Sequence, residues 1–171
     1  MSEQVAWMQN EELFKQQLLI GVEWQYRVAE YLLRQNITVY VPKATFRKDT
    51  SEIGQYADQV DLYAAGLPIE VKSSKRTFTG THDVFKPLIV CSKSSFDQLK
   101  KPPYAFITIS RETQAMVVVR SHSYPNWVVR RFEDKKRGIT DHFYVVNDPY
   151  IYSIDRLVDY LQRKMEWSGV A

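Results

Sequence analysis

The sequence predicts a single α/β or α+β domain, spanning residues 1–171, in which helices flank a mixed central sheet. Three observations support this prediction. Apolar residues recur at helical spacing over residues 18–32 and again over residues 154–165. Between these stripes, residues 59–73 alternate apolar and polar side chains, as half-buried strands do. A chain of 171 residues with 44% hydrophobic content is long enough to form one substantial core.

The first helix is expected to begin at Asn10, after a short tail, and to run to about residue 35, with Gly21 able to introduce a bend. One stripe of this helix holds Leu18, Val22, Gln25, Ala29 and Leu32. Residues 37–41 are typical of a strand that Pro42 ends, and residues 43–58 of a polar loop or short arm.

Further strands are expected over residues 85–91, 104–109, 115–120, 127–132 and 142–146. Ser95 and Gln98 form a capping-box pattern for a short helix that ends at Pro102. Ser153 is placed to cap a last helix. The apolar face of that helix comprises Ile154, Leu157, Val158, Leu161 and Met165.

The most informative segment is the predicted hairpin around Ala65 and Gly66. If residues 59–64 pair with residues 67–73 about this turn, Asp61 lies opposite Glu70, and Lys72 points to the same face. Directly opposed residues have Cβ atoms roughly 4.5–5.5 Å apart. Two carboxylates that close repel each other unless a cation lies between them. The hairpin therefore indicates a metal site beside an ammonium group.

The other face of the hairpin carries the apolar residues that a core requires, which are Val60, Leu62, Ile69 and Val71. An acid two residues before a lysine is a weak signal alone, because Glu133 and Lys135 also match it. That match lies in a charged stretch without a preceding strand acid. The alternative for the Glu70 match is a surface hairpin with a Glu–Lys pair and Asp61 nearby by accident.

The pattern of Asp61 followed by Glu70, Val71 and Lys72 resembles the PD-(D/E)XK nuclease superfamily, which has the restriction-endonuclease-like fold, over roughly the first 100 residues. Val60 stands where the family name has Pro, a position that varies in the family. The resemblance implies a Mg²⁺-dependent deoxyribonuclease, most simply an endonuclease. Asp61, Glu70 and the Val71 carbonyl would hold Mg²⁺, or Mn²⁺ as its substitute. Lys72 would orient or deprotonate the attacking water, or stabilise charge on the phosphorane.

Superfamily members often carry a further acid on the helix before the hairpin. Glu23 and Glu30 share one helix face but lie about 10 Å apart along the axis, so one of them is expected to reach the metal. Glu23 is favoured because Gly21, just before it, permits close approach. A solvated helix Glu is the alternative, and Glu52 and Asp58 are further candidates in the loop.

DNA is the expected partner. Ser73, Lys75 and Arg76 follow the hairpin and are placed to contact backbone phosphates, although a polar loop is the simpler interpretation. More Lys and Arg residues follow as far as residue 101 and again over residues 130–137. Three aromatic residues are candidates for stacking on bases: Phe78, Tyr124 and Trp127. A homodimer would suit a double-strand cut.

The sequence also bears on the compartment. Cys91 is the one cysteine and is expected to be buried and inert, which excludes an internal disulfide. The N-terminal residues show no signal peptide, and no apolar run reaches membrane-spanning length. The expected location is cytoplasmic, away from membranes. The alternatives in function are an inactive relative that binds nucleic acid or a partner protein, and an RNA-cleaving nuclease.

Overall fold

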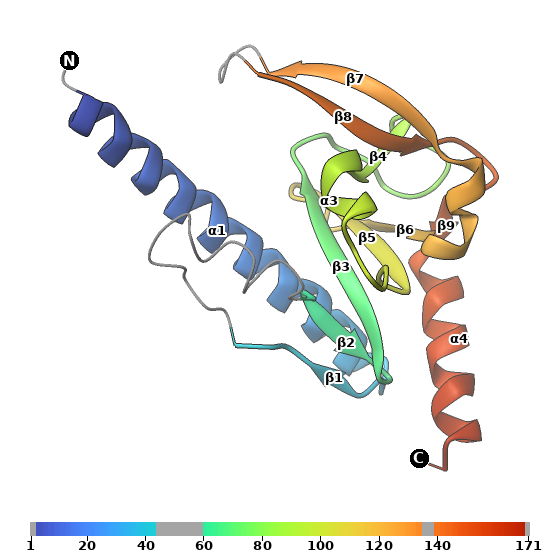
Figure 1. Ribbon diagram of the computed structural model, residues 1–171. Coiled ribbons are helices and arrows are strands. Elements are labelled where there is room, and N and C mark those ends of the chain that lie inside the picture. Colours follow the sequence, from blue (N-terminus) through green and yellow to red (C-terminus); the bar gives the residue numbers. More distant parts are fainter. Residues whose placement is uncertain (1–2, 44–59, 135–138, 170–171) are drawn as a thin grey trace.

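A computed structural model describes residues 3–43, 60–134 and 139–169 (Figure 1). The helices are α1 (Glu3–Arg34), α3 (Lys93–Asp97), the 3-10 helix η2 (Ser121–Asn126) and α4 (Ile154–Trp167). The strands are β1 (Val39–Tyr40), β2 (Leu62–Ala64), β3 (Leu67–Ser74), β4 (Leu88–Ser92), β5 (Ala105–Ser110), β6 (Met116–Arg120), β7 (Val128–Asp134), β8 (Ile139–Val146) and β9 (Tyr152–Ser153).

The strands form two sheets. The larger sheet has the order β1-β2-β3-β5-β6-β9, and it is mixed because β3 and β5 run parallel while its other neighbours are antiparallel. The smaller sheet has the order β4-β8-β7 and is antiparallel. The expected mixed α/β architecture with a central sheet is therefore confirmed. The sequence analysis predicted one central sheet, and the structure adds a second, smaller one.

Each face of the larger sheet packs against a different partner. On one face, Ile69 and Ile107 share a core with Leu32 of α1 and Leu161 of α4 (Figure 1). The other face contributes Phe106, Val117 and Val119 to a second core, whose further members are Val90, Trp127, Tyr144 and Val146. The layers are therefore helices, a six-stranded sheet and a three-stranded sheet. Apolar residues on both faces of β5 and β6 require cover on both sides, and here a sheet rather than a helix covers one of them.

The helix boundaries differ from the sequence prediction at two places. Helix α1 begins at Glu3 instead of Asn10 and continues through Gly21. Helix α3 begins after Ser92, so Ser95 lies inside it and the capping-box prediction is wrong. Lys93 forms an ion pair with Asp97 one turn later, which supports the earlier start.

Helix α4 begins after Ser153 as predicted, although the Ser153 side chain makes no capping hydrogen bond. Its predicted apolar face is confirmed, because Leu157, Val158 and Leu161 are buried and both Ile154 and Met165 pack against the same core. Within the described parts of the chain, no helix is both long and apolar enough to cross a membrane.

The central hairpin forms with the predicted register. Leu62 pairs with Ile69, and Ala64 with Leu67. Both turn residues have positive φ, 48° at Ala65 and 76° at Gly66, which is the backbone of a type I′ turn. The Ala65 amide donates to the Thr38 carbonyl at 2.8 Å, and this bond helps to hold a non-glycine residue in that conformation.

Candidate functional site

Asp61 lies at a bend immediately before β2 begins. Leu62 and Ile69 are the outermost pair of the β2–β3 register, so Asp61 and Glu70 are the next residues along the two segments. Because β2 does not extend to Asp61, the Asp61 side chain, and not its backbone, makes the next hydrogen bond to β3. Its Oδ2 accepts a hydrogen bond from the Val71 amide at 2.7 Å. A side chain thus satisfies a buried backbone donor at the point where the two strands separate.

Helix α1 supplies a second contact to the same carboxylate. Gln25 Nε2 donates to Asp61 Oδ1 at 2.5 Å. Gln25 lies on the inward stripe of α1, between the half-buried Val22 and the buried Ala29. The sequence placed Gln25 on this stripe without giving it a role. The sequence feature that could have identified Gln25 is a polar residue on a helix stripe that is otherwise apolar.

Glu70 and Lys72 follow on the face of β3 that points toward the smaller sheet. Lys72 Nζ lies 2.6 Å from Glu70 Oε1, and the side chains are 44% and 27% exposed, respectively. Both line a cavity of about 720 Å³, which also receives Lys100 and Lys101 from the segment after α3. Three ammonium groups and one carboxylate therefore meet at a partly open hollow, which suits an anionic substrate.

Burial and the nearby Glu70 carboxylate raise the pKa of Asp61 to about 7, although the hydrogen bond from Val71, the Lys72 ammonium and Gln25 oppose the change. For Lys72, burial lowers the pKa, but the charge and hydrogen bond of Glu70 and the charge of Asp61 outweigh it and raise the pKa. Asp61 is thus an acid that does not ionise readily, while Lys72 stays protonated. An added cation would relieve the repulsion between the two acids.

The donors of the site fit a hard divalent ion. Pro68 accepts a hydrogen bond from the Tyr104 amide at the start of β5, so the backbone groups of alternate β3 residues, Val71 among them, face β2. The Val71 carbonyl and amide consequently lie on the side of Asp61. Two carboxylates and one carbonyl are oxygen ligands of the kind that Mg²⁺ prefers. The predicted ligands Asp61, Glu70 and Val71 supply donors of this kind.

The structure does not bring Glu23 to the two acids. Among the described residues, no three His, Cys, Asp or Glu side chains lie close enough to share a metal ion. Glu23 is exposed, and Gln25 is the α1 residue that reaches Asp61. The argument from Gly21 also fails, because an added Cβ at Gly21 would meet nothing within 4 Å. Glu30 forms an ion pair with Arg34 on the helix surface.

Glu52 and Asp58 lie outside the described residues. Leu62, Ile69 and Val71 are buried in the core as predicted. Val60 is different, since it is half-buried and lines the cavity with Glu70. The chain bends at Asp61, so the alternation of the strand does not continue to Val60.

The predicted phosphate contacts lie around the end of β3. Ser73 Oγ accepts a hydrogen bond from Arg111 Nε at 3.0 Å, and Arg76 lies over the ring of Phe85 at 4.6 Å. Lys75 is exposed. Two of the three residues are therefore engaged within the protein. Serine and arginine in these contacts keep further donors for a ligand.

Two of the three candidate stacking residues are core residues. Phe78 is 1% exposed and Trp127 is 8% exposed, so neither offers a face to a base. Both belong to the core between the two sheets. Tyr124 is 40% exposed, but its ring packs against Phe96 at 5.0 Å. Aromatic residues beside basic segments thus fill the space between the sheets.

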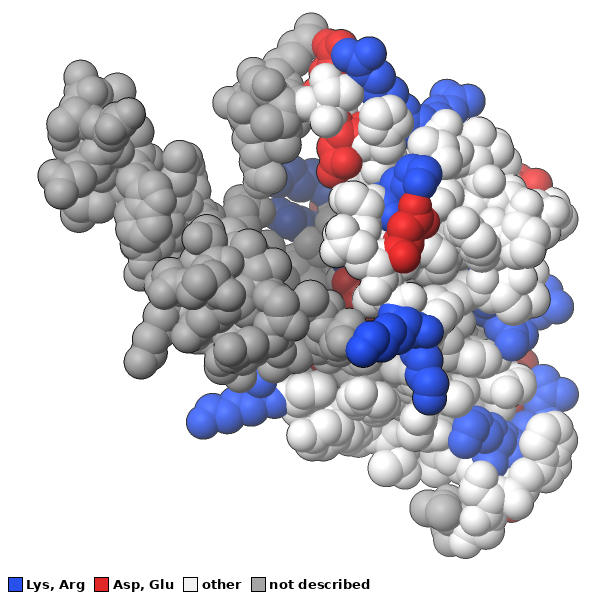
Figure 2. Space-filling view, in the orientation of Figure 1, with Lys and Arg blue, Asp and Glu red and all other residues white. Residues whose placement is uncertain are grey.

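The basic side chains are spread over the surface. Figure 2 shows Lys and Arg distributed over the visible described face, several of them beside Asp or Glu. Lys86 pairs with Asp148, and Lys93 with Asp97. Residues 135–137 of the second basic cluster lie outside the described residues. The fold brings Lys100 and Lys101 to the Glu70 cavity. The spacing of side chains along a strand or helix could not predict this, because the two lysines are far from Glu70 in the sequence.

Cys91 is buried as predicted, and burial raises the pKa of its thiol to about 12. It lies in the wall of the same cavity as Lys72. A thiol with so high a pKa is not a nucleophile at neutral pH. The chemistry of the cavity therefore belongs to its oxygen and nitrogen groups.

No protein-family model matches this chain, and comparisons with curated proteins and with solved structures also found no match. The resemblance to the PD-(D/E)XK superfamily accordingly depends on the hairpin residues and on the arrangement of groups around them.

Proposed function

We propose that the protein is a Mg²⁺-dependent deoxyribonuclease with the restriction-endonuclease-like arrangement, acting at the cavity beside Glu70 and Lys72. The observation that carries the proposal is the position of Asp61 and Glu70 directly beyond the Leu62–Ile69 pair, with Lys72 bonded to Glu70. The Glu70 carboxylate lies near enough to Asp61 to raise its pKa, and a cation between the two acids would relieve that repulsion. An ammonium group beside them supports phosphate chemistry.

Each residue has a role in this reaction. Asp61 and Glu70, with the Val71 carbonyl, would hold the ion. When bound, Mg²⁺ would polarise the scissile phosphate and acidify the attacking water. Gln25 and the Val71 amide fix the Asp61 carboxylate at 2.5 and 2.7 Å, so this ligand is ordered before an ion arrives.

The state of Lys72 narrows its role. Its raised pKa keeps the amine protonated near neutral pH, so it is a poor base for the attacking water. A protonated Lys72 instead donates hydrogen bonds to phosphate oxygens and stabilises the charge that builds on them. Water attacks phosphorus and gives up a proton to solvent, the bond to the leaving oxygen breaks, and that oxygen takes up a proton from solvent or a neighbouring donor.

The test is cleavage by the purified full-length protein of plasmid, linear, branched and single-stranded DNA, with Mg²⁺ or with EDTA. Cleavage is expected with Mg²⁺ alone. Asp61→Asn should lower it by about a hundredfold or more while DNA binding persists. Asp159→Asn, an exposed acid on α4, is the matched control and should cleave as the wild type does.

Three results would contradict the proposal. They are equal cleavage by Asp61→Asn, cleavage that EDTA does not affect, and absence of cleavage across the panel. DNA binding without cleavage would identify a binding protein of the same architecture. The same substrates made as RNA would show whether the enzyme distinguishes the two nucleic acids.

A further inference from the structure

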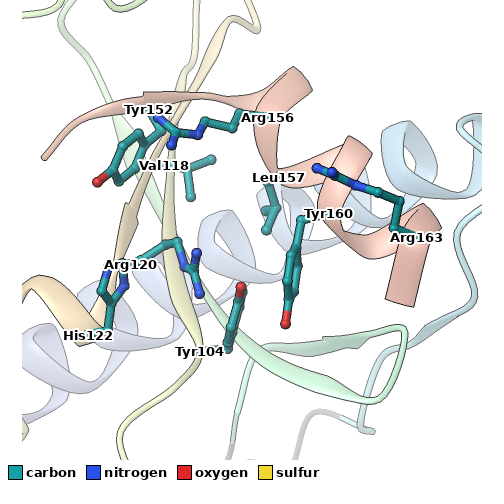
Figure 3. A pocket seen from close by; sticks show the side chains of 9 residues that line it. All are labelled: Tyr104, Val118, Arg120, His122, Tyr152, Arg156, Leu157, Tyr160 and Arg163. Atoms are coloured by element: carbon teal, nitrogen blue, oxygen red, sulfur yellow. The ribbon is translucent and has the colours of Figure 1, made fainter. Parts of the chain in front are cut away.

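A second cavity, of about 230 Å³, lies between the end of β6 and helix α4 (Figure 3). Three arginines line it, Arg120 from β6 with Arg156 and Arg163 from α4. No Asp or Glu of the described residues is among its lining side chains. The cavity is therefore strongly positive, and the charge is not neutralised from within.

Arg120 is fixed by two tyrosines. Its Cζ lies 4.6 Å from the ring centroid of Tyr104 and 5.3 Å from that of Tyr160. The two rings are themselves stacked, with centroids 5.3 Å apart and planes 11° apart. In Figure 3 the guanidinium of Arg120 lies beside these rings. Stacking uses the flat face of a guanidinium and leaves its N–H groups, which lie in the plane, free to bind an oxyanion.

The Arg120 Nε is buried and has no hydrogen-bond partner among the described residues. An unpaired buried donor, especially a charged one, costs stability unless a ligand or water accepts its hydrogen bond. Arg156 repeats the arrangement, with its Cζ 4.6 Å from the ring centroid of Tyr152. Arg163 Nε donates to the Asp159 carbonyl of its own helix, so a hydrogen bond also restrains the third guanidinium.

His122 lines the same cavity, and its pKa is lowered chiefly by burial and further by the charge of Arg120. Within the described chain, no ion pair joins Arg120, Arg156 or Arg163 to a carboxylate. Three guanidiniums held in place without an acid partner are what a bound oxyanion would require.

We propose that this cavity binds a phosphate group, presented as a free phosphate or as the monoester at the end of a nucleotide or nucleic acid. Arginines from both β6 and α4 line the cavity, and a tetrahedral dianion accepts hydrogen bonds from several sides, which a planar carboxylate does less well. At about 30 Å³ per water molecule, the cavity of about 230 Å³ has room for roughly eight waters, enough for a hydrated phosphate but not for a nucleoside as well. The tyrosine rings face each other and Arg120, so they do not serve as platforms for a base.

This cavity is separate from the site at Asp61. Met116 and Val118 of β6 face the helices, and Arg120 continues the same alternation. Glu70 and Lys72 face the smaller sheet instead. The two cavities therefore lie on opposite faces of the six-stranded sheet, and phosphate binding is tested without reference to cleavage.

The test is calorimetric titration of the full-length protein with inorganic phosphate in EDTA, against chloride at the same ionic strength. Saturable binding is expected for the wild type. Arg156→Gln, an exposed position that should fold normally, is expected to weaken binding about tenfold or more. Lys164→Gln removes one charge from the same helix outside the cavity and should bind as the wild type does. Arg120→Gln, checked for folding by circular dichroism, should abolish binding.

Absence of saturable binding beyond that of chloride would overturn the proposal, as would equal weakening by Lys164→Gln. Adenosine monophosphate and a 5′-phosphorylated oligonucleotide separate the two sources of the group. Tighter binding of the phosphorylated oligonucleotide than of free phosphate assigns the cavity to nucleic-acid ends, and the reverse assigns it to small phosphates. Equal competition by a 5′-hydroxyl oligonucleotide would contradict recognition of a monoester.

Discussion

Asp61 is the residue on which the proposed chemistry depends most. It is a carboxylate at a strand end that completes the hydrogen bonding of β3 through the Val71 amide. The same position keeps it largely away from water and close to Glu70, and these two effects raise its pKa to about 7. The Asp61 carboxylate thus makes a structural hydrogen bond and is also repelled by Glu70. A bound cation would relieve this repulsion and leave the hydrogen bond in place.

The raised pKa of Asp61 predicts a pH dependence of stability. The carboxyl has a pKa of about 7 in the folded protein and about 3.9 in the unfolded chain. The folded state therefore holds this proton more tightly, and the contribution to stability is complete below about pH 4 and lost as the pH rises through about 7. Asp61→Asn is neutral at every pH. At pH 8 in EDTA it should be about 1–3 kcal/mol more stable than the wild type.

Urea unfolding from pH 4 to pH 8 measures this difference, with Asp159→Asn as the control that should follow the wild type. Added Mg²⁺ at pH 8 should stabilise the wild type and leave Asp61→Asn unchanged, because the variant lacks a charged ligand. If Asp61→Asn and the wild type have parallel stability curves, Asp61 does not carry a raised pKa in the folded protein.

Asp61 and Glu70 could be paired from the sequence because side chains alternate along a strand with a period of two. The turn at Ala65 and Gly66 fixed the centre of that pairing. The partner Gln25 could not be found in this way. Its contact with Asp61 depends on how α1 lies across the hairpin, which local spacing does not determine.

At the scale of elements, α1 links the core to the site. Its buried residues Val28, Ala29 and Leu32 pack against the sheet, and this packing fixes the rotation of the helix. That rotation turns Gln25 toward Asp61 and leaves Glu23 exposed. The structure does not support Glu23 as the third acid. The seven-residue spacing of Glu23 and Glu30 shows that they share a helix face, but it does not show which face meets the hairpin.

Gln25→Ala tests this link between helix and site. The hydrogen bond from Gln25 lowers the pKa of Asp61, so its loss should raise that pKa further above about 7. The pH at which DNA cleavage reaches half its maximum should rise by about one unit. Gln16→Ala, an exposed glutamine of the same helix, should leave the profile where it is. A profile that does not move in Gln25→Ala would show that α1 does not act on Asp61.

The strands themselves were largely predictable and their grouping was not. Strands β5 and β6 are apolar runs joined by a short turn, so their pairing follows from local sequence. Strand β4 instead pairs with β8, with Leu88 opposite Val146. Pairing between strands so far apart in the sequence depends on which apolar face of the larger sheet the helices leave unburied. Phe106 and Val119 lie on that face, and their burial explains the second sheet.

At the scale of the whole molecule, the distribution of charge matters more than its sum. The net charge is only +3, and Figure 2 shows basic side chains interspersed with acids. The cavity beside Glu70 differs, because Lys72, Lys100 and Lys101 gather there around one acid. We therefore expect DNA to be held by a few local contacts and not by the general field of the protein.

This expectation is testable through the salt dependence of DNA binding. Each phosphate contact contributes about 0.9 to the slope of log affinity against log salt for duplex DNA. Lys100→Gln combined with Lys101→Gln should reduce the slope by about 1–2 and weaken binding similarly for all sequences. Lys164→Gln lies on α4, away from the cavity, and should leave the slope unchanged. Fluorescence anisotropy with a labelled duplex in EDTA measures each slope without cleavage. An unchanged slope in the double variant would remove the two lysines from the DNA interface and leave the Asp61 site to be judged by cleavage alone.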